Sequence, residues 1–491
     1  MQHLLPLAAV LPLVAGALVP AVAWRRPDRA WGWAVAAGSG TLVVTALLTL
    51  RLLRTGPFSY PLGGWAPPWG IELRFDALSA LSLGIAMIYL AVLVFSRRYA
   101  QSAVAPQRRA WFYSLLLVNL GGLVGFACTA DLFNMFVCME LVSVSSYALV
   151  AAGGGRIAAL AAFKYLVAGA VSSMLVLFSV GILHALTGSL NMADVAVRLA
   201  DVEARGPVLL AVGALTVGFM VKAALFPLHL WLPDAHASAP GPVSAVLSAL
   251  VVKLGVIGLV RVLPLFTGLE WLSLAPLQEA LAWLGAIAIV TGALAALLQE
   301  DIKLMLAYST VSNVGYIVLG IGLATPPAVT GGLVHVLNHG LIKATLFLAA
   351  GAIIYRTGYR TLRDLRGVGR MMPWTSVALS LGVLSIVGLP PTAGFLGKWY
   401  IALGAFEAGR PGFAIALLAG ALLIFVYYLR ILNALYFRAP LREEMLAVRE
   451  APVSMLLPVL ALALLCLLGG LFGSGPVALA ARAAAALAGG G

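Results

Sequence analysis

A short stretch that interrupts a long apolar run decides the fold: Val221-Lys222-Ala223-Ala224-Leu225-Phe226-Pro227-Leu228-His229. Proline cannot donate the main-chain hydrogen bond of a helix, so a helix through this run must break near Pro227. A similar stretch, from Gly388 to Lys398, contains Pro390 and Pro391. Breaks at membrane depth are tolerated where the freed main-chain groups face protein or water. Both stretches therefore predict a broken membrane helix with a lysine beside a hydrated cavity. Prolines that only bend their helices are the alternative.

The composition around these stretches is that of a membrane protein. Of the 491 residues, 62% are apolar and only 10% are charged, whereas soluble domains contain about 25% charged residues. The net charge of +13 does not predict a nucleic acid partner, because no polar segment is long enough to carry a basic surface. The three cysteines lie in apolar runs without metal-ligand spacing, so neither a disulfide framework nor a metal site is expected.

Apolar runs of about 20 residues, the length that a bilayer-spanning helix needs, recur along the whole chain. We expect about 14 spans, beginning near His3, Ala30, Asp76, Ala110, Asp131, Ile157, Pro207, Pro242, Pro276, Asp301, Pro326, Met372, Pro411 and Pro452. The sequence thus predicts an all-α polytopic membrane protein embedded in a lipid bilayer.

Basic residues are divided unevenly between the connections that join these spans. Odd-numbered connections carry 17 lysines and arginines, whereas even-numbered connections and the C-terminus carry eight. Because basic residues accumulate in cytoplasmic loops, we expect the odd connections in the cytoplasm. Both chain termini should then lie outside a cell inner membrane.

The cations within the spans indicate an internal repeat. Only six of the 31 basic residues are lysines, and a buried lysine, unlike arginine, can lose its proton near neutral pH. Offsets of 179, 176 and 177 residues separate three pairs of these cations: Lys164 and Lys343, Lys222 and Lys398, and Lys253 and Arg430. Such an offset covers five spans, an odd number, so the two copies have opposite orientations. Inverted repeats place their functional site near the membrane midplane.

This repeat predicts four parts of the chain. Residues 1–109 form three N-terminal helices, residues 110–264 form the first five-helix repeat, residues 276–436 form the second, and residues 437–491 form a C-terminal helix. Each repeat contains one of the two broken helices.

Glu140 lies in the middle of the fifth expected span. An unpaired charge there costs about 2.5–3.5 kcal/mol on insertion scales, so this carboxylate should have a cationic partner. The equivalent position in the second repeat is Ile317, so only the first repeat has an acid. Moving Glu140 toward or away from Lys222 would make the lysine take up or release a proton. A carboxylate that merely joins two helices is the alternative.

Three titratable residues of the eleventh expected span, His335, His339 and Lys343, recur at intervals of four. This spacing places them on one helical face and favours a relay for protons, with hydrogen-bonded core histidines as the alternative. A zinc site would need a further ligand, and no HExxH pattern is present, so we expect no metal.

Other ionisable residues extend this set. Lys253 lies well inside the eighth expected span, and Lys164, His229 and His236 are secondary candidates. The sequence contains no phosphate-binding loop, catalytic serine elbow or cysteine cluster for an iron–sulfur centre. We therefore expect no cofactor and no catalytic residue of a redox or hydrolytic reaction in this chain.

At these residues the sequence resembles the antiporter-like, proton-translocating subunits of Mrp-type multisubunit Na+/H+ antiporters, respiratory complex I and membrane-bound hydrogenases. The stretch from Thr187 to Asp194 and the lysine at position 398 are most similar to the D-type subunits of Mrp antiporters. Cys138 and Met139 stand where phenylalanines are common in the family. The matching stretches are Asp131 to Glu140, Phe163 to Tyr165, Thr187 to Asp194, Pro227 to Pro240, His335 to Lys343 and Gly388 to Lys398.

The resemblance implies a role for each matching ionisable residue. Glu140 and Lys222 would form the controlling ion pair, Lys253 and the His335 to His339 region would continue the path, and Lys398 would be the terminal proton carrier. It further implies a subunit that moves protons within a larger membrane complex, in exchange for a monovalent cation such as Na+.

Two alternatives to the antiporter subunit stay open. The same chain could be a proton-pumping subunit of a quinone-reducing, complex I-like enzyme or of a membrane-bound hydrogenase, whose redox sites lie in other subunits. It could also be a passive scaffold.

Overall fold

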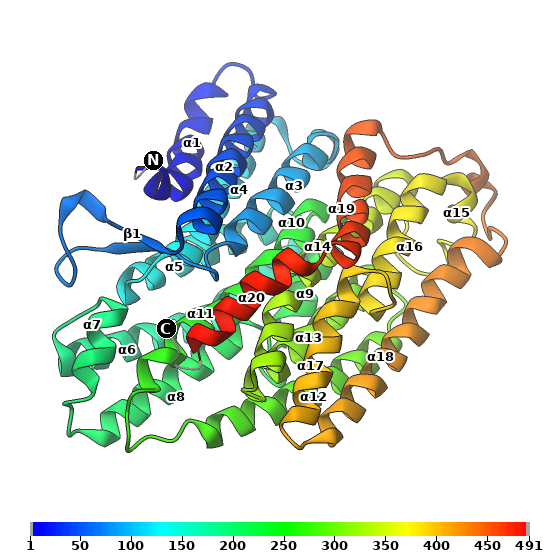
Figure 1. Ribbon diagram of the computed structural model, residues 1–491. Helices are drawn as coiled ribbons and strands as arrows, with labels where there is room; N and C mark the ends of the chain where they lie inside the picture. The colour runs from blue at the N-terminus through cyan, green and yellow to red at the C-terminus, as the bar shows by residue number, and fades with distance from the viewer. Residues whose placement is uncertain (1–2, 488–491) are drawn as a thin grey trace.

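The computed structural model describes residues 3–487, and helices dominate this part of the chain (Figure 1). Thirteen of the described helices are long and apolar enough to cross a membrane, with the continuous segment Gly241–Phe266 counted as one helix. A broken pair of shorter helices, α16 and α17, occupies the place of the expected twelfth span. The expectation of an all-α polytopic membrane protein is confirmed.

The elements follow one another in the order of the expected spans. The N-terminal part contains α1 (Leu4–Val22), α2 (Arg29–Thr55), β1 (Phe58–Pro61), η1 (Leu62–Gly64), β2 (Glu72–Phe75) and α3 (Leu81–Ala103). The next part contains α4 (Pro106–Cys128), α5 (Leu132–Ala151), α6 (Gly155–Thr187), α7 (Met192–Leu199), α8 (Arg205–Lys222), α9 (Trp231–Ser238), α10 (Gly241–Val246), η2 (Leu247–Val251), α11 (Lys253–Val262) and η3 (Leu263–Phe266). The remainder contains α12 (Ala275–Leu297), α13 (Ile302–Gly322), α14 (Pro326–Thr357), α15 (Val368–Met371), α16 (Pro373–Val387), α17 (Ala393–Glu407), α18 (Pro411–Leu432), η4 (Asn433–Phe437), η5 (Glu443–Ala447), α19 (Val453–Leu471) and α20 (Ser474–Leu487).

The two halves of the bundle share local features. An aspartate caps the N-terminus of α5 and of α13: Asp131 accepts from the main-chain N–H of Asn134, and Asp301 accepts from that of Lys303. Each aspartate also forms an isolated β-bridge to the segment that follows a long helix, α6 of 33 residues or α14 of 32 residues. Such N-caps satisfy donors that a helix leaves free. These shared features support the repeat that the cation spacing predicts.

The first broken helix consists of α8 and α9. Helix α8 ends at Lys222, Ala224 takes a positive φ of 52°, and α9 begins at Trp231. The indole N–H of Trp231 donates to the carbonyl of Val221 at 3.0 Å. A side chain thus satisfies a carbonyl at the end of α8, as burial of the break requires.

The second broken helix consists of α16 and α17. Gly388 ends α16 with a φ of 90°, a conformation that favours glycine. The carbonyls of Ile386 and Val387 at this end accept hydrogen bonds from the ammonium of Lys398, at 2.7 and 3.0 Å. The chain therefore breaks at both places that the prolines predict.

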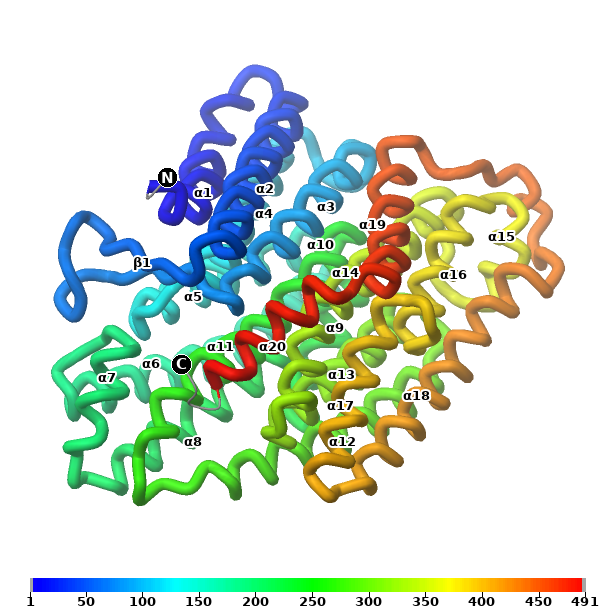
Figure 2. Tube along the Cα trace, in the orientation of Figure 1, coloured from blue at the N-terminus to red at the C-terminus, as the bar shows by residue number. Residues whose placement is uncertain are grey.

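The C-terminal part differs from the single helix expected in residues 437–491. It contains the short turn η5, the membrane-length helix α19 and a further helix, α20. Helix α20 packs against α14, and Figure 2 shows it, in red, running across the bundle toward the green segment that includes α11. At 14 residues, α20 is about 21 Å long, too short to cross a bilayer core of about 30 Å.

Glycines let α12 and α13 pack with their main chains in close approach. A Cβ atom at Gly315 would lie 2.6 Å from the carbonyl oxygen of Gly285, and one at Gly285 would lie 2.6 Å from the main-chain nitrogen of Leu319. Both neighbours are backbone atoms, which cannot turn aside as a side chain can.

We expect Gly315→Ala to lower the apparent melting temperature of the purified protein. The added methyl group must push the two helices apart, at a cost of about 1–3 kcal/mol. Gly213→Ala on α8 is the matched control, because a Cβ there meets no atom within 4 Å. Equal melting temperatures for the two variants would contradict this packing.

Candidate functional site

Glu140 on α5 and Lys222 at the end of α8 face each other, with 3.9 Å between Oε1 and Nζ. Hydroxyl groups complete their environment. The Lys222 ammonium donates to Oγ of Ser143 at 2.7 Å and to the carbonyl of Gly169 at 3.3 Å, and Ser173 donates to the Glu140 carboxylate. The ion pair that the sequence predicts is therefore present.

Glu140 is less buried than its position in the span suggests. Its side chain is 33% exposed, whereas that of Lys222 is 5% exposed. Glu140 shares one face of α5 with Phe133, Val137 and Val144, and all three are exposed. The place of Glu140 in the middle of its span predicts a buried side chain. Its exposure depends instead on which face of α5 the neighbouring helices cover.

Main-chain carbonyls bind the ammonium groups of the lysines in this bundle. Besides the bond from Lys222 to Gly169, Lys253 donates to Ser248 at 2.5 Å and Lys343 donates to Leu306 at 2.8 Å. Lys398 donates to two carbonyls at the end of α16. Of the ammonium groups named in this paragraph, only that of Lys222 has a carboxylate within 4 Å.

Lys253 follows a π-helical turn, η2, in which the main-chain N–H of Val252 donates to the carbonyl of Leu247. Wider turns of this kind often mark functional sites. A cavity of about 20 Å³ adjoins Lys253 and is also lined by Val336 and Gly340 of α14. A water molecule needs about 10–15 Å³ measured in this way, so there is room for one beside the ammonium.

His335 and His339 lie on the same buried face of α14, as their spacing predicts. Their ring centroids are 5.7 Å apart, and Nε2 of His335 lies 3.2 Å from Oδ1 of Asn313. Neither ring nitrogen of His339 has a hydrogen-bond partner among the described residues. Gly340, which follows His339, lines the cavity beside Lys253, and Gly397, which precedes Lys398, packs closely against His335. This face of α14 therefore lies between Lys253 and Lys398.

Lys343 and Lys398 contact residues that sequence reasoning missed. The Lys343 ammonium donates to Oγ of Ser309 at 2.6 Å, and Ser309 lies 3.0 Å from the hydroxyl of Tyr428. The ammonium of Lys398, which is partly buried, lies 4.5 Å from the ring centroid of Tyr316. Hydroxyl and aromatic partners of this kind leave no signature in the order of residues along the chain.

Lys303 is another residue that sequence reasoning missed, because it is one of the 17 basic residues that the sequence assigns to the odd-numbered connections. It is the second residue of α13, its side chain is 6% exposed, and its ammonium donates to the carbonyls of Ala237 and Ala239 at the end of α9. Without it, the odd connections still carry 16 basic residues against eight. Apolar residues on both sides of Lys303 were the available signal.

The secondary candidates occupy different environments. Lys164 pairs with Asp234 at 2.7 Å, and both side chains are about half exposed on the flank of the bundle. His236 is fully buried against Phe347, and His229 lies in the first break. Lys164 thus stands apart from the buried groups, whereas His236 lies among them.

The described residues contain no group of three or more His, Cys, Asp or Glu side chains placed to hold a metal ion. The cysteines Cys128, Cys138 and Cys466 are buried and form no disulfide.

The bundle, its two broken helices and its row of buried lysines define a polytopic membrane protein of the antiporter-like class. The chain belongs to the family described as "NADH:quinone oxidoreductase/Mrp antiporter, TM", whose model matches residues 129–423. The resemblance recognised in the sequence is confirmed.

Named relatives come from both branches of this family. The N-type subunit of the NADH-quinone oxidoreductase of Desulforudis audaxviator is 40% identical over 454 residues, which cover 90% of each chain. The D-type subunit of the Na(+)/H(+) antiporter of Bacillus subtilis is 33% identical over 400 residues, which cover 81% of this chain and 80% of the relative.

Solved structures with the same fold are chains of multisubunit membrane complexes. A chain of the membrane-bound sulfane sulfur reductase, an archaeal respiratory membrane complex, has a TM-score of 0.91 and 30% identity, and 99% of this chain and 98% of that chain are covered. A chain of the Mrp complex from Dietzia sp. has a TM-score of 0.89 and 25% identity, with 99% and 97% covered.

A double-mutant cycle tests the ion pair itself. We expect Lys222→Met to lower the apparent melting temperature, because it leaves the Glu140 carboxylate without its cation. Adding Glu140→Gln should recover most of the loss, with a coupling of about 0.5–3 kcal/mol.

The exposed pair of Lys164 and Asp234 supplies the control for this cycle. Lys164→Met and Asp234→Asn should show a coupling of about 0.2–1 kcal/mol, as is usual for exposed pairs. A cycle at Glu140 and Lys222 with no coupling would show that the two charges do not interact in the folded protein.

Proposed function

We propose that this chain is the proton-translocating subunit of a multisubunit antiporter that exchanges protons for a monovalent cation, with Na+ the expected cation. The ion pair between Glu140 and Lys222 at a broken helix is the observation that carries this proposal. The D-type antiporter relative and the fold of the Mrp complex chain support it.

The ion pair can control the proton on Lys222. Two opposite charges about 4 Å apart attract each other by about 4 kcal/mol at an effective dielectric constant of 20, which is about a thousand-fold in proton affinity. Any movement that takes the Glu140 carboxylate away from Lys222 therefore favours release of the lysine proton. Lys222 ends α8, next to a break, where the main chain can accommodate such a movement.

The released proton needs acceptors farther along the bundle. We propose the order Lys222, Lys253, the group of His335, His339 and Lys343, and then Lys398. The cavity beside Lys253, the unpartnered nitrogens of His339 and the close packing of Gly397 against His335 support this order. His236 is buried against Phe347 of α14, and the Lys303 ammonium donates to the carbonyl of the next residue, Ala237, so we place it on a side branch of the same path.

The chain works, in this proposal, inside a cell inner membrane with both termini outside, and beside other membrane subunits of a hetero-oligomeric complex. The unequal division of basic residues supports the orientation. The exposed face of α5 around Glu140 supports the presence of a neighbour, because an exposed carboxylate in hydrocarbon is costly.

Transport by the intact complex tests the proposal. The complex, purified through a tag on this chain, is reconstituted in vesicles that contain a pH-sensitive dye, and a sodium gradient is applied. We expect Glu140→Gln and Lys222→Met each to lower the rate of pH change at least tenfold, because either change abolishes the controlling pair.

Lys164→Met is the matched control, since it removes a lysine that stands apart from the buried groups. It should transport at the wild-type rate. Wild-type transport by an assembled Glu140→Gln complex would reject the mechanism.

A second function is favoured by the N-type oxidoreductase relative at 40% identity and by the likeness to a respiratory complex. In that case the chain is a proton-pumping subunit of a quinone-reducing, complex I-like enzyme or of a membrane-bound hydrogenase. The driving force distinguishes the two. An antiporter acidifies or alkalinises the vesicles with a sodium gradient alone, whereas the pump does so only after an electron donor and acceptor are added.

A further inference from the structure

A cavity of about 420 Å³ lies away from the lysine path, between β2, the end of α11 and α20. Ligand pockets commonly have volumes of about 300–1,000 Å³. The segments that line it, including the start of α7, belong to even-numbered connections or to the C-terminal helix, so they share one face of the membrane. Its walls combine arginines on one side with apolar side chains on the other.

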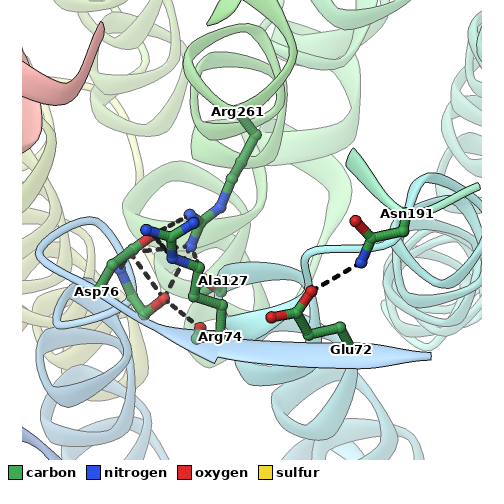
Figure 3. Close-up of polar contacts among 7 residues, drawn as sticks. Glu72, Arg74, Asp76, Ala127, Asn191 and Arg261 are labelled. Atoms are coloured by element: carbon green, nitrogen blue, oxygen red, sulfur yellow. Dashed lines mark hydrogen bonds and ion pairs between the residues drawn. The ribbon is translucent and has the colours of Figure 1, made fainter. Parts of the chain in front are cut away.

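The charged wall is built around Arg261, whose side chain is 10% exposed. Figure 3 shows that its guanidinium reaches the carboxylate of Asp76 and the carbonyl of Ala127, with the latter bond at 2.7 Å. Ser79 accepts a further bond at 2.8 Å, yet the buried Nε has no partner among the described residues. Asp76, Ser79 and Ala127 therefore hold the Arg261 guanidinium in place at the wall of the cavity.

Asp76 pairs with Arg261, so its negative charge does not neutralise the other two arginines of this wall. Burial raises the pKa of the Asp76 carboxyl, but Arg261 outweighs burial and holds that pKa below its ordinary value, so the pair is ionised. Glu72, the second carboxylate, accepts a hydrogen bond from Asn191 at 2.7 Å (Figure 3).

Arg74 and Arg482 add positive charge to the cavity. Arg74 lies no nearer than 4.0 Å to Asp76, and Arg482 forms no ion pair within the part of the chain that the structure describes. With three arginines and two carboxylates, the lining carries a net positive charge. Guanidinium groups bind phosphate through paired hydrogen bonds, so an anion with several oxygen atoms fits this wall.

The opposite wall requires an apolar part in the ligand. Helix α20 contributes Leu479, Ala483 and Leu487, and α2 and the turn after α11 contribute Leu52 and Leu265. Arg482 is the only charged residue among residues 474–487. Helix α20 therefore presents an apolar surface with a single cation at the cavity.

We propose that this cavity binds the phosphate group of an anionic membrane phospholipid, with the acyl chains packed along α20. The phosphate lies among Arg74, Arg261 and Arg482, which all line the cavity. A phospholipid supplies both the anion and the apolar part, and it surrounds every membrane protein. The bound lipid would join the β1–β2 hairpin to the C-terminal helix, two elements far apart in the sequence.

Native mass spectrometry of the intact complex, titrated with phosphatidylglycerol, tests this site. We expect the double variant Arg74→Gln and Arg482→Gln to bind phosphatidylglycerol at least tenfold more weakly than the wild type. Arg74 is about half exposed and Arg482 is exposed, so folding should be unaffected. Arg51→Gln with Arg54→Gln is the matched control, because it removes the same charge at the nearby end of α2, and neither residue lines the cavity. It should bind as the wild type does.

Further measurements separate the lipid from other occupants. Excess inorganic phosphate should not displace the lipid, because free phosphate has no chain to bury. Displacement would assign the cavity to a soluble anion and overturn the proposal, as would equal phosphatidylglycerol binding by the double variant and its control. Loss of a neighbouring subunit from the double variant, with lipid binding intact, would assign the cavity to a protein partner and would also overturn it.

Discussion

The hydrogen bond from a buried lysine ammonium to a main-chain carbonyl is the interaction on which the rest of this bundle depends. A charged lysine in hydrocarbon is costly unless its donors are satisfied. A carboxylate would satisfy them but would also fix the charge, whereas a carbonyl is neutral and accepts from the ammonium and the neutral amine alike. Lys253, Lys303, Lys343 and Lys398 all use carbonyls. Helix ends and the π-turn supply these carbonyls for Lys253, Lys303 and Lys398, whereas Lys343 donates to Leu306 within the continuous helix α13.

The two halves of the bundle differ in which cations they bury. Arg430 stands where the cation spacing pairs it with Lys253, and the structure places it in the last turn of α18, paired with Glu300 at 2.5 Å. Both side chains are partly exposed. The buried lysines of the second half are instead Lys303 and Lys343, and Lys398 is partly buried. A cation that cannot lose its proton has thus been kept out of the interior, where it would halt any transfer by deprotonation.

The sequence predicts this architecture where the signal lies along the chain. Apolar run length predicts the spans, prolines predict the breaks, and the interval of four predicts the common face of His335 and His339. The features that were missed depend on contacts between distant segments. The partial exposure of Glu140 depends on which helices cover α5, the burial of Lys303 depends on the end of α9, and the shape of the arginine-lined cavity depends on where α20 crosses the bundle. None of these features can be read from residues that are adjacent in the sequence.

The π-helical turn η2 has a consequence for the register of the helix that carries Lys253. Such a turn holds one residue more than an α-helical turn, and each residue of an α-helix adds about 100° of rotation. Deleting a single residue between Leu247 and Val251 would restore regular winding and swing the segments on either side by about that angle. Lys253 would then point away from the cavity that it shares with Val336 and Gly340 of α14, while every residue of the proposed path was still present. The orientation of Lys253 therefore depends on the number of residues in η2 as well as on which residues they are.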